Sequence, residues 1–391
     1  MDCENFFLIT VPVENNRERT WQALLEKTQA AGLSTNHKFE VPDFKVGTLD
    51  TLMKESDVLA SNDNYCEMMV RKIANQLSSL YNQGSKHTAA DRVNEALHAN
   101  GKTMKGYLQA FRWEGAKFNV NTNLPDLAKD VVGKVQEIDG EMKKKLAMYN
   151  KIKSQQSSID RANNGNLMTR DLTGIVRPEH IAAADSEFLV TLFVTVSKPA
   201  YDTWRTNYES MMEQPVVVPR SSQLVTEDSE YGLFSITVFR KAVDAFKDKC
   251  RELRFTVRDF EYSVEAKEQA DKLASDVEAE FNKKHLALIR WLTTMFGEAY
   301  IAWIHTKAIR LFVESVLRYG LPVNFVAVAM EPAPKGAKRL RLALNSAYAS
   351  LDTTGASLKD GELGLTMGGA PREYFPYVSV TAPIAQIAPR R

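Results

Sequence analysis

Four charged residues near position 310 are spaced so that a single helix face would carry all of them. In the stretch AWIHTKAIRLFVESVLRYG they fall at i, i+3, i+7 and i+11, as Lys307, Arg310, Glu314 and Arg318. Because an α-helix turns once every 3.6 residues, this spacing predicts one charged stripe. A cationic stripe beside His305 would suit a phosphorylated substrate. The alternative, a ladder of ion pairs on a solvent-facing helix, is favoured because Glu314 follows Arg310 by four residues.

The patterns of known catalytic sites are otherwise missing. The sequence contains no GxxxxGK[ST] loop, no HExxH, no CxxC and no GxSxG elbow. Its six histidines never pair at metal-ligand spacing, and the glycines of GELGLTMGG do not open a helix after a strand. We therefore predict no catalytic residue, no cofactor and no metal site, and we expect a protein that is not itself an enzyme.

Two short segments indicate an exposed loop that a partner protein could contact. VPRSS, residues 218–222, is followed by the acidic TEDSE, residues 226–230. A plain turn and a docking loop are equally compatible with this composition. If partners bind, we predict contacts at eight residues, which are Arg220, Ser221, Ser222, Arg240, Lys241, Lys307, Arg310 and Arg318.

Charge and composition exclude several classes of protein. The 391 residues include 50 basic and 49 acidic side chains, so a net charge of +1 gives no basis for broad nucleic-acid binding. A local basic cluster at Lys335, Lys338, Arg339 and Arg341 has the spacing of a solvated helix face. Hydrophobic residues make up 44%, which is ordinary for a globular protein long enough for two or more domains.

The start of the chain and its cysteines indicate a cytoplasmic protein. MDCENFFLITVPVENN lacks the basic region of a secretory signal, and no run of about 20 apolar residues could span a membrane. The three cysteines, Cys3, Cys66 and Cys250, are odd in number and far apart, so they predict neither a disulfide framework nor a zinc site.

Two segments have the narrow apolar seam of helices that need a partner helix. They cover 126–164 and 264–285, and we predict that they pair antiparallel as a coiled-coil neck on the order of 35–40 Å long. Two unrelated surface helices are the alternative. The residues predicted to pack in the seam are Val131, Val135, Ile138, Met142, Tyr149, Ala270, Leu273 and Val277.

The region between these helices, 165–263, has the pattern of a small inserted domain. Runs of β-branched residues alternate with helical patterns in the order β-α-β-β-α-β, which is the ferredoxin-like order. The expected elements are Glu187–Lys198, Pro199–Met212, Pro215–Pro219, Tyr231–Arg240, Lys241–Leu253 and Arg254–Ser263. We call this region the head.

The outer segments, 1–125 and 286–391, are predicted to form one discontinuous domain, the foot. Strands are expected at Phe6–Val13, Pro322–Met330 and Tyr374–Val380, and helices at Asp50–Leu80 and Ala89–Trp113. We expect Thr48 or Asp50 to cap the first helix and Gly320 to end the helix that carries the charged stripe. The predicted fold class is therefore α+β, an elongated dumbbell of foot, antiparallel neck and head.

Several long blocks of the sequence resemble the C-subunits of the vacuolar-type proton-translocating ATPases (V-ATPases). The similarity runs from Lys38 to Val378 and is weaker within 335–369 and after Val380. The blocks are KFEVPDFKVGTLDTLMKESDVLA, FRWEGAKF, SEFLVTL, VPRSS, TVFRKAVDAFKDKCRELRFTVRDFEY, LIRW, EAYIAWIHTKAIRLFVESVLRYGLPVNF and EYFPYV.

The resemblance implies a non-catalytic stator and assembly subunit, supporting ATP-driven proton transport and organelle acidification. It implies that the head binds a peripheral stalk of subunits E and G. The foot is implied to contact a second such stalk and the N-terminal domain of the a-subunit. The protein would then be cytoplasmic and peripheral to vacuolar or endosomal membranes, in a complex that assembles reversibly. Actin binding is associated with some members, and a cytosolic actin-binding or scaffolding adaptor is the alternative function.

Overall fold

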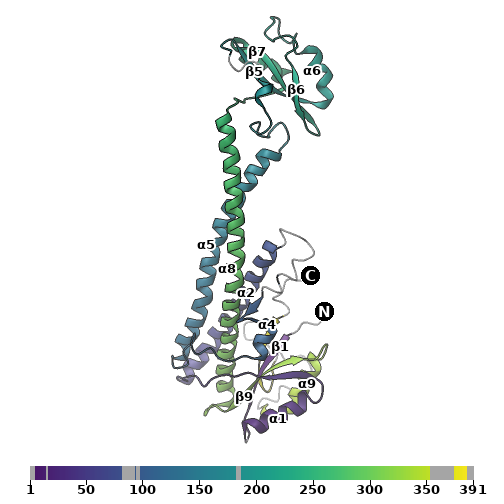
Figure 1. The fold of residues 1–391 in the computed structure, drawn as a ribbon. Helices are drawn as coiled ribbons and strands as arrows, with labels where there is room; N and C mark the ends of the chain where they lie inside the picture. The colour runs from purple at the N-terminus through teal and green to yellow at the C-terminus, as the bar shows by residue number, and fades with distance from the viewer. Residues whose placement is uncertain are drawn as a thin grey trace. The chain divides into compact units, whose positions relative to one another are not determined.

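The structure is a computed structural model, and it describes residues 5–14, 16–81, 93, 97–181, 186–352 and 374–384 (Figure 1). Contacts within the chain group it into two units. Unit 1 combines Met1–Lys145 with Ala287–Arg391, and unit 2 is Leu146–Leu286. Each unit is described by itself below. The predicted dumbbell shape and its five-part division stay predictions.

Unit 1 contains a four-stranded antiparallel sheet that joins the two ends of the sequence. The strand order is β10-β1-β9-β2, from strands Val378–Pro383, Asn5–Pro12, Phe325–Pro332 and Ser34–Lys38 respectively. β1 is almost wholly buried because it lies between β10 and β9. The expected strands at Phe6–Val13 and Pro322–Met330 are thus confirmed within a few residues, and the third begins later than expected.

Two amphipathic helices pack on this sheet. Helix α1, Arg17–Thr28, begins where the side chain of Asn16 accepts a hydrogen bond from the backbone of Glu18. Helix α9, Ala337–Ala347, buries two leucines one turn apart, Leu340 and Leu344. A short 3₁₀ turn, Ala349–Leu351, follows it. The leucines of α9 join strand residues and Trp21 of α1 in one apolar core, so this face of the sheet is closed.

The predicted helix Asp50–Leu80 is confirmed as α2, Leu49–Tyr81, and the hydroxyl of Thr48 accepts a hydrogen bond from the backbone of Thr51 at its start. The predicted helix Ala89–Trp113 is confirmed only over Met104–Gln109 and is wrong over the hairpin that precedes it. A hairpin of β3, His98–Ala99, and β4, Lys102–Thr103, precedes a six-residue helix α4, Met104–Gln109. The left-handed backbone of Asn100 and Gly101 makes the hairpin turn.

Two helices are the longest in the described part of the chain, ahead of α2 with its 33 residues. Helix α5 covers Leu124–Asn164, and helix α8 runs without interruption over the 56 residues Val264–Tyr319. The boundary predicted at residue 285 is therefore not a helix end. The predicted end at Tyr319 is confirmed, because Gly320 follows with φ of +79°, a conformation that glycine adopts without strain. In the described part of the chain, no helix is long and apolar enough to cross a membrane.

Burial divides the predicted seam residues into two groups. Those on α5 are buried: Val131, Val135, Ile138, Met142 and Tyr149. In unit 1, α2 also covers α5, since Lys72 Nζ lies 2.9 Å from Asp139 Oδ1.

On α8, by contrast, Ala270 is exposed, Leu273 is 58% exposed and Val277 is half-buried. The expectation that all three are packed is not met. Tyr149 instead stacks on Phe281 with ring centroids 5.6 Å apart, and its Oη lies 3.2 Å from His285 Nδ1. A helix pair buries only a narrow stripe on each helix, and on α8 that stripe passes through Phe281 rather than Leu273.

Unit 2 contains a second antiparallel sheet with the strand order β6-β7-β5-β8. Its elements follow the predicted β-α-β-β-α-β order. They are β5 Leu189–Ser197, α6 Tyr201–Asn207, β6 Gln223–Glu227, β7 Tyr231–Phe239, α7 Val243–Glu252 and β8 Thr256–Arg258, with 3₁₀ turns at Pro178–His180, Lys198–Ala200 and Arg240–Ala242.

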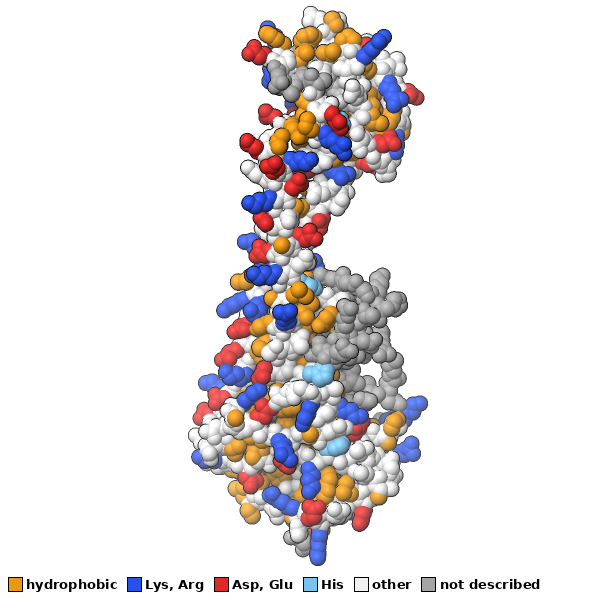
Figure 2. All heavy atoms as spheres, in the orientation of Figure 1, with side chains coloured by type: hydrophobic (Ala, Val, Ile, Leu, Met, Phe, Trp, Pro, Cys, Tyr) orange, Lys and Arg blue, Asp and Glu red, His pale blue; other side chains and the backbone are white. Residues whose placement is uncertain are grey.

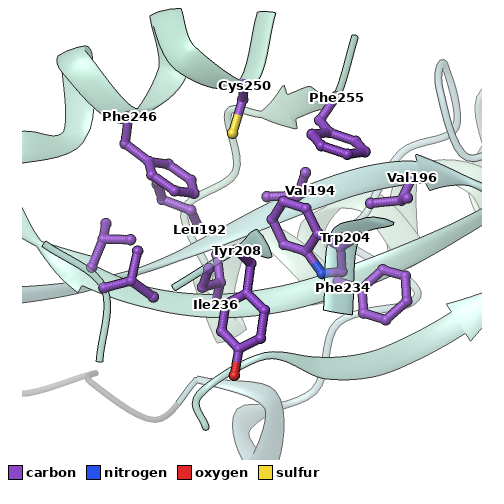
Figure 3. Packing of buried hydrophobic residues seen from close by; sticks show 12 residues of the cluster. Leu192, Val194, Val196, Trp204, Tyr208, Phe234, Ile236, Phe246, Cys250 and Phe255 are labelled. Carbon is purple, nitrogen blue, oxygen red and sulfur yellow. The ribbon is translucent and has the colours of Figure 1, made fainter. Parts of the chain in front are cut away.

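One strand of this sheet was predicted in the wrong place. Pro215–Pro219 forms only an isolated bridge from Val217 to Val238, because its two prolines cannot donate to a ladder, and β6 takes the expected place. Helices α6 and α7 cover one face of the sheet, where Figure 3 shows Trp204, Phe246 and Cys250 among the buried strand side chains.

Candidate functional site

The first residue of the charged stripe on α8, Lys307, faces neither a substrate site nor solvent. Lys307 is 1% exposed, and so it is unavailable to the partner that the sequence predicted for it. It is buried because α2 lies against this face of α8 and presents Asp63, a carboxylate that is itself 3% exposed.

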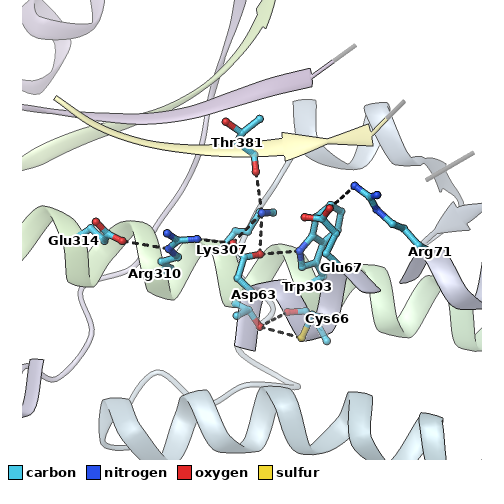
Figure 4. A network of polar contacts seen from close by, with 11 residues as sticks. Asp63, Cys66, Glu67, Arg71, Trp303, Lys307, Arg310, Glu314 and Thr381 are labelled. Carbon is cyan, nitrogen blue, oxygen red and sulfur yellow. Dashed lines mark hydrogen bonds and ion pairs between the residues drawn. The ribbon is translucent and has the colours of Figure 1, made fainter. Parts of the chain in front are cut away.

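Asp63 is the centre of a hydrogen-bonded cluster shown in Figure 4. Its Oδ1 lies 2.8 Å from Lys307 Nζ and accepts a hydrogen bond of 2.8 Å from Trp303 Nε1. Its Oδ2 accepts a bond of 2.9 Å from Arg310 Nη1, while Arg310 Nε donates to Glu314. The carboxylate is thus surrounded by donors, which is the condition under which a buried charge is tolerated.

Lys307 also reaches a third element. Its Nζ donates to the carbonyl of Thr381 in β10 at 2.9 Å and lies 4.7 Å from the ring centroid of Trp303. Burial lowers the pKa of Lys307, and the negative charge of Asp63 opposes that shift. Since the ammonium group already has these partners and almost no solvent access, it cannot hold an external anion. The cluster instead ties α2, α8 and the C-terminal strand together.

His305, which the sequence placed beside a candidate anion site, is a structural residue. It is fully buried; Nδ1 lies 2.8 Å from the carbonyl of Ile301, and Nε2 accepts a hydrogen bond of 3.0 Å from the backbone of Glu114. Burial lowers the pKa of His305 to about 4, so the ring is neutral near pH 7. The interpretation of His305 as a hydrogen-bonded helix histidine is confirmed.

The last turn of α8 fastens the sheet of unit 1. Arg318 is exposed, and its Nη1 donates to the carbonyl of Phe375 at 3.0 Å. Tyr319 Oη donates to the carbonyl of Thr10 at 2.6 Å and accepts from the backbone of Val378 at 3.1 Å. Arg318 and Tyr319 therefore help to hold β1 and β10 against the helix, and of the two only Arg318 leaves a charged edge open to solvent.

The predicted loop contacts in unit 2 have mixed surroundings. Arg220 is exposed, with a left-handed backbone at φ of +61°. The hydroxyl of Ser222 accepts a hydrogen bond from Trp204 Nε1 at 3.0 Å, and that of Ser221 accepts from the backbone of Thr237 at 3.2 Å. Both serines thus shape the loop, and they are half-buried, whereas Arg220 is exposed.

Arg240 and Lys241 are both exposed at the end of β7. Arg240 Nε donates to the carbonyl of Glu187 at 3.2 Å, and its Nη2 donates to that of Ser186 at 3.4 Å. Arg240 and Lys241 thus lie side by side, and Lys307 and Arg310 lie together elsewhere, around Asp63. The structure does not join the eight predicted residues into one site.

Helix α9 and the turn before it carry the basic cluster whose spacing in the sequence predicts an ordinary solvated helix face. In the structure this cluster surrounds an exposed leucine. Lys335, Lys338 and Arg339 are exposed on α9 and its preceding turn, and Leu342 beside them is 68% exposed. Arg341, by contrast, is half-buried, with its guanidinium 4.3 Å from the ring centroids of both Phe7 and Phe375. The signal that could have identified this face is the lack of any acidic residue between Glu331 and Asp352.

Elsewhere, charges of both signs are mixed over the visible surface (Figure 2). Within the described ranges, no group of three or more His, Cys, Asp or Glu side chains is arranged to hold a metal ion. The two described cysteines, Cys66 and Cys250, are buried, and burial raises the pKa of each thiol to about 12. Neither thiol has the exposure or the low pKa of a reactive cysteine.

Comparison with known proteins places the chain in one family along nearly its full length. The model of the V-ATPase C-subunit family matches residues 6–378. The V-type proton ATPase C-subunit 1-A of Danio rerio is 41% identical over 382 residues, which cover 95% of this chain and 96% of the relative. The C-subunit 1 of Xenopus laevis is 41% identical and the C-subunit of Manduca sexta 40% identical, with the same coverage. The chain therefore belongs to the family of V-ATPase C-subunits.

Proposed function

We propose that this protein is a non-catalytic stator and assembly subunit of a V-type proton-translocating ATPase. It would link peripheral stalks of subunits E and G to the membrane sector through the N-terminal domain of the a-subunit. The observation that carries the proposal is the family match over residues 6–378. The protein would act on the cytosolic face of a vacuolar or endosomal membrane and support acidification without hydrolysing ATP.

The two long helices suit such a role. A rotary motor needs a stator because torque on the rotor must be resisted by parts that do not turn. Helix α8 continues for 56 residues, and a helix is locally stiffer than a flexible linker. Polar side chains near the C-terminal end of α8 tie α2, β1 and β10 to the helix, so the helix is anchored inside unit 1.

The division into two units supports bivalent attachment. If unit 2 binds one E–G stalk and unit 1 binds another stalk with the a-subunit, two moderate interfaces act as one strong attachment. Weakening either interface then lowers the affinity of the whole disproportionately. Reversible assembly of the pump would follow from such an arrangement, because a change at one contact is enough to release the protein.

Reconstitution tests the proposal. Membranes carrying a V-ATPase stripped of its own C-subunit are mixed with the full chain, and ATP-driven proton uptake is followed with a pH-sensitive dye. We expect uptake to be restored and the purified chain to show no ATPase activity by itself. Binding to the stripped complex without any recovery of proton uptake would contradict a stator role.

A further inference from the structure

We propose that the outer face of helix α9, formed by Lys335, Lys338, Arg339 and Leu342, docks an acidic amphipathic segment of another protein in the assembly. The inference rests on the proposed function and deepens it by assigning one of its contact surfaces and the chemistry of the partner. The four residues are called the α9 face below.

Three of the four residues, Lys338, Arg339 and Leu342, share one side of the helix, and Lys335 lies in the turn before it. Lys338 and Leu342 are separated by four positions and Arg339 and Leu342 by three, so their side chains are neighbours on the helix surface. The opposite side carries Leu340 and Leu344, which are buried in the sheet core. The α9 face therefore points away from unit 1's own core.

No carboxylate that the structure describes neutralises the charges of the α9 face. Among the described residues, no carboxylate lies within ion-pair distance of Lys335, Lys338 or Arg339. Two other cations of unit 1 do have acidic partners: Lys38 pairs with Glu18, and Lys105 pairs with Glu331. Leu342 adds one large apolar side chain, 68% exposed, to this cationic surface. Cations around an exposed leucine complement a segment that presents both carboxylates and an apolar residue.

The stability of the helix does not account for these residues. Lys338 and Arg339 lie in the first turn of α9, where the helix dipole favours acidic side chains, and that turn contains none. Gly336 at the N-cap offers no side-chain hydrogen bond to the free backbone groups. Because the arrangement costs helix stability, a binding role explains it better than folding does.

Burial and charge favour a protein partner over a membrane or a nucleic acid. A helix that lies on a bilayer inserts its apolar side, but here that side, Leu340 and Leu344, is already buried in the sheet core. Three cations on a chain of net charge +1 are too few for the sequence-independent binding of a phosphate backbone. An acidic helix needs only a short stretch of complementary charge.

Charge reversal on the full chain provides the first test. The double variant Lys338→Glu with Arg339→Glu should fold at least as well as the unmodified chain, because acidic residues in the first turn suit the helix dipole. We expect its affinity for a V-ATPase lacking the C-subunit to fall about tenfold at low salt, since two attractions become repulsions. The matched control, Lys54→Glu with Lys144→Glu, changes the net charge equally at exposed lysines of α2 and α5 and should bind normally.

The outcomes separate the two proposals. If the unmodified chain does not bind the stripped complex, the proposed function fails and this inference fails with it. If the unmodified chain binds and the double variant binds equally well, with thermal unfolding confirming that both are folded, only the assignment of the α9 face is overturned. A tenfold loss confined to the α9 variant supports it.

A photo-crosslinker placed at Leu342 identifies what covers the face. The full chain carrying p-benzoylphenylalanine at this position is assembled into the stripped, membrane-bound complex and irradiated, and the cross-linked products are sequenced by mass spectrometry. We expect one protein segment with several Asp or Glu residues within two helical turns of the cross-link. Cross-links to lipid, to a segment without acidic residues, or equal in yield to those from a probe at Lys144 would overturn the inference.

Discussion

The buried pair of Asp63 and Lys307 predicts that one substitution, Lys307→Met, changes stability in opposite directions with and without Asp63. Replacing Asp63 by Ala leaves the Lys307 ammonium group almost without solvent and without a counter-charge. Breaking a buried ion pair from one side in this way costs about 3–5 kcal/mol. Arg310 loses less, because its side chain is 20% exposed and keeps Glu314.

Removing the lysine instead should cost less. In Lys307→Met the apolar chain still fills the space, and Asp63 keeps hydrogen bonds from Trp303 and Arg310. The carbonyl of Thr381 loses one donor, and the expected cost is about 1–2 kcal/mol. Adding Lys307→Met to Asp63→Ala should then recover about 2 kcal/mol, because it removes the uncompensated charge. The same substitution is thus destabilising in one background and stabilising in the other.

Urea unfolding at pH 7 measures these differences. Of the five tryptophans only Trp204 belongs to unit 2, so a Trp204→Phe background makes the emission of the remaining indoles report on unit 1. The exposed pair of Lys134 and Glu137 is the control, and Glu137→Ala should change stability by less than about 1 kcal/mol. Costs of the two core substitutions that simply add in the double variant would refute the coupling between Asp63 and Lys307.

Three further predictions concern burial. The contribution of His305 to stability should fall by about 3 kcal/mol between pH 6.5 and pH 4, because the unfolded residue binds a proton near pH 6.5 and the folded ring only at about 4. His305→Gln should reduce the slope of stability against pH in acid titrations followed by circular dichroism, and an unchanged slope would contradict this. Gly297→Ala should cost about 1–3 kcal/mol, because the new Cβ would lie 2.8 Å from the carbonyl oxygen of His98. Gly140→Ala, which has open space around it, should leave the denaturant midpoint unchanged or raise it. Equal effects of the two substitutions would refute the close packing at Gly297. In thermal unfolding, Ile138→Asp should cost about 3 kcal/mol or more because Ile138 is buried, and Leu273→Asp less than about 1 kcal/mol because Leu273 is exposed. The reverse order would mean that the buried stripe of α8 passes through Leu273.

Local sequence patterns predicted the helix ends and the order of elements, because these depend on neighbouring residues in the chain. The end of α8 at Tyr319 follows from a glycine in the left-handed conformation, and the start of α2 follows from the hydroxyl of Thr48. The order of strands and helices in unit 2 follows from the alternation of β-branched runs and amphipathic segments. The strand predicted at Pro215–Pro219 was wrong for a local reason as well. The apolar run favoured a strand, but its two prolines lack the backbone N–H groups that a strand ladder needs.

The surroundings of Lys307 could not be predicted in this way. Its spacing from Arg310 and Glu314 shows that they share a helix face, but not which element covers that face. The carboxylate that pairs with buried Lys307 is 244 positions away in the sequence, on a helix whose own pattern marks Asp63 only as one acidic residue among several. Likewise, periodicity places both Val135 and Leu273 on apolar stripes, and only the packing shows that the first is buried and the second exposed.

The protein's function is indicated by family resemblance rather than by site chemistry. A search for active sites would select Lys307 and His305, but both side chains are buried and hydrogen-bonded within the protein. The α9 face lies where the resemblance is weak, and a cluster of cations on a helix is by itself common. Its distinctive property, the absence of neighbouring carboxylates around an exposed leucine among the described residues, depends on the positions of the surrounding elements.

The most direct test of a stator role is a cross-linking map of the full chain in a reconstituted V-ATPase. We expect lysines of unit 2 to cross-link to subunits E and G, and lysines of unit 1 to cross-link to the a-subunit and a second stalk in the same particles. Cross-links from unit 1 that never include the a-subunit, or cross-links from either unit to the rotor, would contradict the proposal that this protein connects the stalks to the membrane sector.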